Sequence, residues 1–522
     1  ALLSMRIVAR GLPTAAVRPR RVQHERVRSQ RPLRACRPLA AAATQPPHAP
    51  SLGAPFFTAE LTPMTTSLHD GGSHSPGETA LWHSAAIVSV PLCAAMAFGD
   101  RLSLGATLVL LLILECCFLR FRQQASRALS EYVVADEHPV SAKETMRRSL
   151  TLFDDPHRWV RDWFLHDEGE EFEEARRDEV ERFVAHSFFG HPKEELSKEQ
   201  RTELQELVQM VEDKAGRPLL EQKRDSEVPF IRHTREPLRL HHQPFIVFAA
   251  TYFLRSLCAG ILTLAGFRRT VHADGMLAHW YRAARPARNG SDKGEAAPRP
   301  MCFLHGLGIG ILPYLATIRE CLKDGRGGTR AAVLMELPQV SLQLLPRVPS
   351  LDDVADVVED ALEMHGLEVR ETAFVAHSFG SFVATRVAQR RGAKEMGRMV
   401  LISPVCVCLC VAHLTRMVLR GGVADERMNW IGRFFMSGEL NTCAALSRVF
   451  WWYRVVFFAD DFPSAGAVFF VGAKDVFLPV PQIMDYLRRT PKASVDFSAH
   501  SVHGSLCIDR ALMRRIRLAI DD

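Results

Sequence analysis

The sequence predicts an α/β fold in the C-terminal half of the chain, with a mostly parallel sheet covered by helices. From about residue 269 onward, short apolar segments alternate with segments of helical periodicity, and this alternation is typical of parallel sheets. Small or polar residues follow directly after several of these segments, where active-site loops of such sheets begin. The predicted strands are 301–304, 331–337, 372–376, 399–403, 468–471 and 493–497, and a helix is predicted over 351–365.

The size and charge of the chain narrow the class of protein. With 522 residues, the chain is longer than one core usually needs, so we expect at least two parts. The residues are 47% hydrophobic and 24% charged, which is ordinary globular composition. The formal net charge of +6 comes from a basic N-terminus. We interpret this basic segment as a targeting signal or as a feature that binds a membrane surface, and a nucleic-acid role is disfavoured.

The first 59 residues have the composition of an organellar transit peptide. They are rich in Arg, Ala and Pro, and Glu25 is their only acidic residue, a pattern found in chloroplast and mitochondrial import sequences. A disordered basic tail is the alternative. Residues 60–80 are rich in Pro, Gly, Ser, Thr and His, and we expect them to form a flexible linker.

The next part, residues 81–122, holds two apolar runs, 85–98 and 104–119. Each is shorter than the roughly 20 residues that cross a bilayer, and Glu115 would be costly deep in hydrocarbon. We therefore expect a membrane-associated hairpin or one tilted span. The alternative is a buried pair of helices.

Residues 123–267 are expected to form a helical accessory region whose role cannot be derived from the sequence. Charged amphipathic segments fill most of it, and the acidic run 167–174 fits a solvated helix face better than a cation site. The last segment, 244–267, is apolar except for Arg255. It is long enough to cross or lie in a membrane, but a helix packed against the next domain would look the same.

Ser378 stands at the centre of the segment Ala376-His377-Ser378-Phe379-Gly380. A β-prone run precedes it and a helical segment follows, and this order of strand, sharp turn, serine and helix describes a nucleophile elbow. A tight turn needs small residues on either side of the serine. Ala376 and Gly380 meet that need, although the first position usually holds glycine.

Further motifs make the chain resemble the serine hydrolases of the α/β-hydrolase fold, specifically esterases and lipases of the AB hydrolase-1 type, over about residues 270–518. They are His305-Gly306-Leu307-Gly308 after one predicted strand, Gly472-Ala473-Lys474-Asp475 after another, and His503-Gly504 after the last. The resemblance implies that Asp475 is the acid and His503 the histidine of a catalytic triad. His500 is the alternative histidine.

Each of these residues has a chemical role in the expected site. His503 would take the proton of Ser378 as general base, and Asp475 would orient the imidazole and stabilise its charged form. The main-chain amides of Leu307 and Phe379 would stabilise the oxyanion. The residues supporting these motifs are His305, Gly306, Ala376 and Gly380.

An insertion at about residues 405–465 lies where the resembled family carries a helical lid. Its aromatic side chains either line a site for a lipophilic chain or pack the lid onto the sheet. They are Trp430, Phe434, Phe435, Trp451, Trp452, Tyr453, Phe457 and Phe458. The alternating Cys406, Cys408 and Cys410 are expected to be buried thiols in a reducing compartment, since the 12 cysteines include no C-x-x-C pair.

The leading hypothesis is a membrane-associated hydrolase of a small lipophilic carboxylic ester. An acyltransferase using the same three residues is one alternative, and a non-catalytic lipid-binding or scaffold protein is another. No phosphate-binding G-x-x-x-x-G-K-[ST] string and no H-E-x-x-H string occurs, so we expect neither a cofactor nor a metal.

Overall fold

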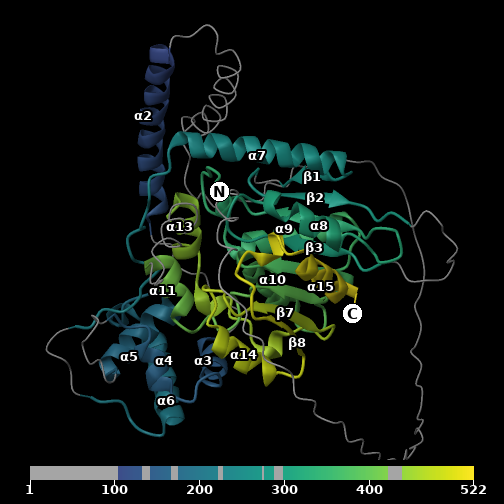
Figure 1. Ribbon diagram of the computed structural model, residues 1–522. Coiled ribbons are helices and arrows are strands. Elements are labelled where there is room, and N and C mark those ends of the chain that lie inside the picture. The colour runs from purple at the N-terminus through teal and green to yellow at the C-terminus, as the bar shows by residue number, and fades with distance from the viewer. Residues whose placement is uncertain are drawn as a thin grey trace, which may run out of the picture. The chain divides into compact units, whose positions relative to one another are not determined.

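The computed structural model describes residues 104–131, 141–165, 175–221, 227–272, 275–286, 298–420 and 438–521. The expectations for residues 1–59, 60–80 and 85–98 lie outside these ranges, as does the acidic run 167–174. Within them the central element is one eight-stranded sheet, in the order β1-β2-β4-β3-β5-β6-β7-β8 (Figure 1).

The sheet is parallel except for one strand. Strand β2 is antiparallel to both of its neighbours, and every other pair of adjacent strands is parallel. The mostly parallel sheet is therefore confirmed, with β1 and β2 added at one edge, and this topology is that of the α/β-hydrolase fold. The strands are β1 Arg268–Val271, β2 Ala278–Arg282, β3 Met301–Leu304, β4 Ala332–Glu336, β5 Ala373–His377, β6 Met399–Ile402, β7 Ala467–Gly472 and β8 Ala493–Ser498.

Alternate residues of each strand face opposite layers of helices, as the period of two along a strand requires. Cys302 and Leu304 belong to one hydrophobic core with α9, α10 and α14. Met301 and Phe303 belong to a second core with α8 and α15. The helices are α8 Leu315–Cys321, α9 Leu351–Met364, α10 Phe379–Arg391, α14 Val480–Arg488 and α15 Arg510–Asp521.

The accessory region is helical, as the sequence indicates. It consists of α3 Ala142–Leu150, α4 Pro156–Arg161, α5 Arg177–Val184 and α6 Lys198–Ala215. Local signals set the helix ends: Ser197 and Gln200 form a capping box at the start of α6, and Gly216 ends it in the left-handed conformation. The buried side chains of these helices share the core of the sheet and the inserted segment.

The inserted segment contains α11 His413–Arg420 and α13 Leu440–Ser447, while residues 421–437 lie outside the described ranges. Its aromatic side chains pack against the accessory helices. Trp452 stacks on Trp163 with ring centroids 5.4 Å apart, and the indole nitrogens of Trp159 and Trp163 both donate to the carbonyl of Cys410. Phe457 packs on Phe462, which contacts Phe469 of β7. The insertion therefore packs onto the sheet, as expected, and onto the accessory helices as well.

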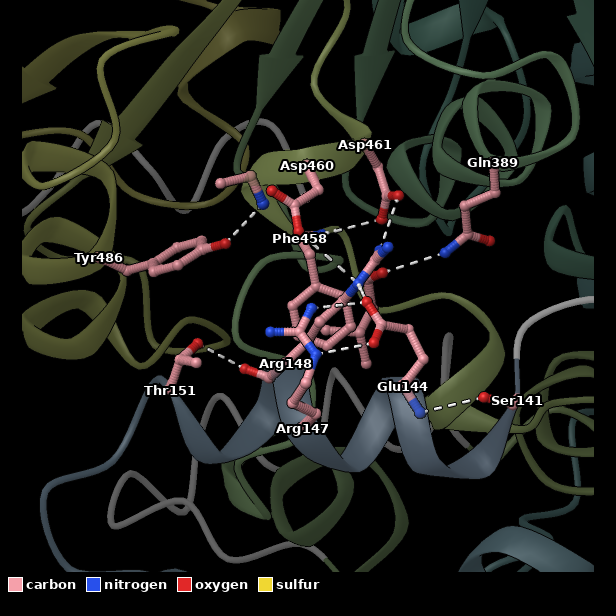
Figure 2. Close-up of polar contacts among 12 residues, drawn as sticks. Ser141, Glu144, Arg147, Arg148, Thr151, Gln389, Phe458, Asp460, Asp461 and Tyr486 are labelled. Carbon is pink, nitrogen blue, oxygen red and sulfur yellow. Dashed lines mark hydrogen bonds and ion pairs between the residues drawn. The ribbon is translucent and has the colours of Figure 1, made fainter. Parts of the chain in front are cut away.

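Polar contacts join helix α3 to the end of the inserted segment (Figure 2). The Arg148 guanidinium donates to Glu144 at 2.6 Å on its own helix and to Asp461 at 3.0 Å. It also lies over the ring of Phe458. Arg148 thus connects two segments that are more than 300 positions apart in the chain.

Helix α2 (Leu104–Leu129) continues past residue 122, where the sequence suggested a boundary. Arg122 does not end the helix because it is buried and donates to the carbonyls of Gln243 and His241. Glu115 accepts a hydrogen bond from the amide of Phe245, the first residue of α7 (Phe245–Leu264), at 2.8 Å. The positive end of the α7 dipole stabilises this carboxylate.

Candidate active site

Ser378 occupies a strained turn between β5 and α10. Its backbone angles are φ 51° and ψ −119°, a region that residues with a side chain rarely adopt. The turn is held because the Ser378 amide donates to the carbonyl of Ile402 and the Ser381 hydroxyl donates to the Ser378 carbonyl at 2.6 Å. A Cβ added to Gly380 would lie 2.3 Å from the carbonyl oxygen of Leu304, so only glycine fits where α10 meets β3.

Three side chains from separate loops meet at this turn. His503 Nε2 lies 2.7 Å from Ser378 Oγ, and His503 Nδ1 lies 2.9 Å from both carboxylate oxygens of Asp475. An ionised carboxylate only accepts hydrogen bonds, so Nδ1 carries a proton, and in the neutral imidazole Nε2 then accepts the Ser378 hydroxyl. His500, the alternative, is exposed beyond the end of β8.

Asp475 is held in its ionised form. Its side chain is buried, which opposes ionisation, but the neighbouring His503 imidazole and hydrogen bonds from His503, Ser403 and the Phe477 amide outweigh burial and lower its pKa. Gly472, three residues earlier, packs against the loop that carries His503, because a Cβ there would lie 2.3 Å from the Ser501 carbonyl. The loop that carries Asp475 and the loop that carries His503 are thus in close contact, which holds the two side chains together.

The turn after β3 runs against the serine. A Cβ added to Gly306 would lie 2.9 Å from the Cβ of Ser378, so the backbone of this turn passes beside the nucleophilic side chain. Leu307 is the next residue of that turn. Phe379 is the first residue of α10, and amides in the first turn of a helix have no acceptor within the helix. Both predicted oxyanion donors therefore lie on segments adjoining Ser378.

A buried chain of hydrogen bonds connects these segments. His377 Nε2 lies 2.7 Å from the carbonyl of His503 and must donate to it, which leaves Nδ1 as an acceptor for the Tyr314 hydroxyl at 3.0 Å. The Tyr314 oxygen in turn accepts from the Gly306 amide at 3.1 Å. Burial lowers the pKa of His377 to about 3, so the imidazole is neutral and this pattern of donors is unique.

His305 anchors the same turn. It is buried, its Nε2 accepts from the amide of Leu337 at 3.1 Å, and its Nδ1 is 2.8 Å from the carbonyl of Gly306. Burial lowers the pKa of His305 to about 4, which keeps Nε2 an acceptor. The structure therefore places His305 at the base of the turn, where it is joined to the residue that follows β4.

Sequence reasoning missed three residues of this arrangement: Tyr314, His377 and Ser403. His377 could have been considered because it directly precedes the serine, and Ser403 because it follows a predicted strand. Ser403 adopts a positive φ of 48° and its hydroxyl lies 3.4 Å from the carbonyl of His503. Tyr314 had no signal, since its role arises from a contact across 63 positions of the chain.

The other clusters do not suggest a cofactor site. In the described part of the chain, no three His, Cys, Asp or Glu side chains are grouped so that they could hold a metal ion. Cys406, Cys408 and Cys410 are free and buried, as expected, and burial raises the pKa of the Cys406 thiol to about 11. These thiols behave as small apolar side chains.

Solved hydrolase structures resemble about half of the chain. A carboxylesterase of the thaumarchaeon Nitrososphaera gargenis is 15% identical, with 48% of this chain and 96% of that one covered and a TM-score of 0.33. An esterase from Thermogutta terrifontis is 16% identical, with 48% and 97% covered and a TM-score of 0.33. For a membrane phospholipase A the identity is 16%, the covered shares 53% and 93%, and the TM-score 0.35.

No family model matches the chain, and no curated protein matches it either. At such low identities and TM-scores, the fold rests on the strand order and directions described above. The site likewise rests on the distances among Ser378, His503 and Asp475.

Proposed function

We propose that the chain is a serine hydrolase that cleaves a carboxylic ester of a lipophilic substrate through an acyl-enzyme at Ser378. The observation that carries this proposal is the 2.7 Å contact between His503 Nε2 and Ser378 Oγ, with Asp475 on the other side of the imidazole. A nucleophile within reach of its base, and a base oriented by a third group, is the arrangement that activates a neutral hydroxyl.

The proposed reaction has two halves. Ser378 Oγ attacks the ester carbonyl while its proton passes to His503 Nε2, and the amides of Leu307 and Phe379 stabilise the resulting oxyanion. The intermediate expels the alcohol, which takes the proton from His503. Water then attacks the acyl-enzyme with His503 again as base, and the carboxylic acid leaves as Ser378 regains its proton.

The apolar helix α7, which is long and apolar enough to cross a membrane, supports a lipophilic substrate. A small pocket lies between the turn after β3 and α7 and is lined by Cys258, Leu262 and Ile311 together with Arg255 and Glu336. Neither Ser378 nor His503 lines this pocket, so we do not assign it to the substrate. Import into a chloroplast or mitochondrion is a further part of the proposal, supported by the Arg-rich composition of residues 1–59.

A fluorophosphonate probe tests the proposal directly. The full-length wild-type chain should be labelled, and Ser378→Ala should not, whereas Ser494→Ala, which removes an exposed hydroxyl on β8, should be labelled like the wild type. A folded wild type that is not labelled would favour the lipid-binding alternative. Turnover of esters of graded chain length should rise with acyl length, and formation of a new ester when an alcohol is added would indicate acyl transfer.

A further inference from the structure

Helices α2 and α7 expose large apolar side chains that no described part of the chain covers. On α7 the exposed members form one stripe: Ile246, Phe253, Leu257, Ile261 and Leu264, with exposed fractions of 40% to 91%. Their spacing of three, four and seven residues places them on one side of the helix. In the described residues, α7 is also the one helix that is long and apolar enough to cross a membrane.

The opposite side of α7 is fixed to the hydrolase domain. Cys258 and Leu262 are buried in the second core of the sheet. Arg255, in the middle of the helix, pairs with Glu336 at the end of β4 at 3.2 Å. Glu336 is largely buried, which opposes ionisation, but Arg269, Arg255 and Trp280 outweigh burial and lower its pKa to about 2. A helix held in this way cannot cross a bilayer without drawing an ion pair and the sheet into hydrocarbon.

Helix α2 differs because residues 109–113 are exposed on every side of the helix. Five consecutive residues, 109–113, are all exposed and all apolar, and five successive positions of a helix point in all directions around its axis. Packing begins further along, where Phe118 contacts the rings of Phe245 and Phe248. A helix that is apolar on all sides needs an apolar environment on all sides.

We infer that α2 and α7 together dock the protein onto the surface of an anionic lipid membrane, with α7 lying in the plane of the interface and the first turns of α2 inserted. Residues 104–114 would reach about 16 Å as a helix, which is about half of a hydrocarbon core of roughly 30 Å. The inserted part therefore enters one leaflet. Helix α2 contacts α7 through Phe118, and this contact lies just after the part of α2 that would be inserted.

The charged residues near the exposed side chains of α2 and α7 favour a lipid membrane over a second protein chain as the partner of this surface. Arg120 on α2 and Arg268, shortly after the end of α7, are exposed, and basic side chains at such positions meet anionic head groups. Helix α7 contains no acidic residue, and Glu115, the one acid of α2, is bound to the amide of Phe245. A second copy laid on α7 would cover one side of α2 and leave the others in water.

This inference does not depend on catalysis at Ser378, so its test measures no turnover and can be repeated with Ser378→Ala. The full chain is prepared as Phe253→Trp, on the exposed stripe of α7, and as Met364→Trp, at an exposed apolar position on α9. Each is mixed with vesicles of phosphatidylcholine and phosphatidylglycerol, with bromine on the acyl chains either near the head group or near the bilayer centre. Tryptophan emission is compared with that of the wild type.

Bromine near the head group should quench Phe253→Trp well beyond the wild type, bromine at the centre should quench it less, and Met364→Trp should match the wild type. Stronger quenching from the bilayer centre would mean that α7 spans, and would overturn the inference. So would an unquenched Phe253→Trp, whether the chain stays off the vesicles, forms a dimer through α7, or covers α7 with another of its own segments.

Discussion

His377 Nε2 donates a hydrogen bond of 2.7 Å to the main-chain carbonyl of His503. The residue before the proposed nucleophile therefore holds the loop that carries the proposed base. Through Tyr314 the same imidazole is connected to the amide of Gly306, in the turn that runs against Ser378. Both ring nitrogens of His377 are therefore hydrogen-bonded. The serine turn, the turn after β3 and the loop of His503 are held relative to one another by the His377 imidazole and the Tyr314 hydroxyl.

Replacing Tyr314 by Phe removes the hydroxyl that joins Gly306 to His377. Two buried groups lose their partner, so we expect the free energy of unfolding to fall by about 1–3 kcal/mol. Displacement of the loops should lower kcat by about tenfold to a hundredfold, with little change in KM. Denaturant titration and steady-state kinetics on an ester measure the two effects.

The matched control is Tyr486→Phe, which removes a hydroxyl that accepts from the amide of Ala459 (Figure 2). The hydrogen bonds of Tyr486 are made to Ala459 and Thr490 and not to the loops around Ser378, so stability should fall similarly while kcat stays at the wild-type value. Equal losses of kcat in the two variants would mean that the hydroxyl of Tyr314 acts only through general stability.

Gly380→Ala tests the close packing of α10 on β3. The added Cβ would lie 2.3 Å from the carbonyl oxygen of Leu304, so the elbow must shift, and we expect a loss of about 2–4 kcal/mol in the free energy of unfolding together with the loss of probe labelling. Gly504→Ala is the control, since nothing lies within 4 Å of its added Cβ. Circular dichroism during thermal unfolding compares the two, and an unaffected Gly380→Ala would contradict the close approach.

Arg148→Gln should separate helix α3 from the end of the inserted segment. Its guanidinium is 20% exposed and reaches Asp461 as well as Glu144, so we expect a loss of about 1–2 kcal/mol. Arg147, which is 55% exposed and pairs with Glu144, is the matched control, and Arg147→Gln should leave the free energy of unfolding close to the wild-type value. Urea titration measures the free energy of unfolding of both variants. Equal losses of this free energy would contradict a specific role for the contact between Arg148 and Asp461.

Because several imidazoles are buried, we expect the protein to lose stability in mild acid. Burial lowers the pKa of His377 to about 3 and those of His233, His279 and His305 to about 4. Between these values and the ordinary value of 6.5 the unfolded chain binds the protons and the folded chain does not. The free energy of unfolding should therefore fall as the pH decreases below about 6.5, by up to about 1.4 kcal/mol per pH unit for each histidine.

Denaturant titrations from pH 7 to pH 5 measure this slope, which should be smaller in His233→Gln. The glutamine amide can replace the donor that His233 Nε2 provides to the carbonyl of Phe450 without binding a proton. A free energy of unfolding that is constant over this range would show that these imidazoles do not control acid stability.

Much of the sheet and the serine turn could be predicted because their signals are local. The run ending at Ala376 is apolar and buried throughout, and it leads directly into a turn that excludes side chains at Gly380. The edge strands β1 and β2 were not predicted, since they are short, and β1 is largely exposed. Whether Glu115 faces lipid or a helix end also could not be predicted, because the amide of Phe245 that binds it comes 130 positions later.

The two indoles that share the carbonyl of Cys410 bear on how the chain is made. Trp159 and Trp163 precede that carbonyl by 251 and 247 positions, so a ribosome has produced most of the polypeptide before either indole can find its acceptor. The side of helices α3 to α6 that packs on the inserted segment therefore stays uncovered until the second half of the chain emerges. A chaperone that binds the nascent chain would therefore be needed mainly in that interval, to cover these apolar side chains.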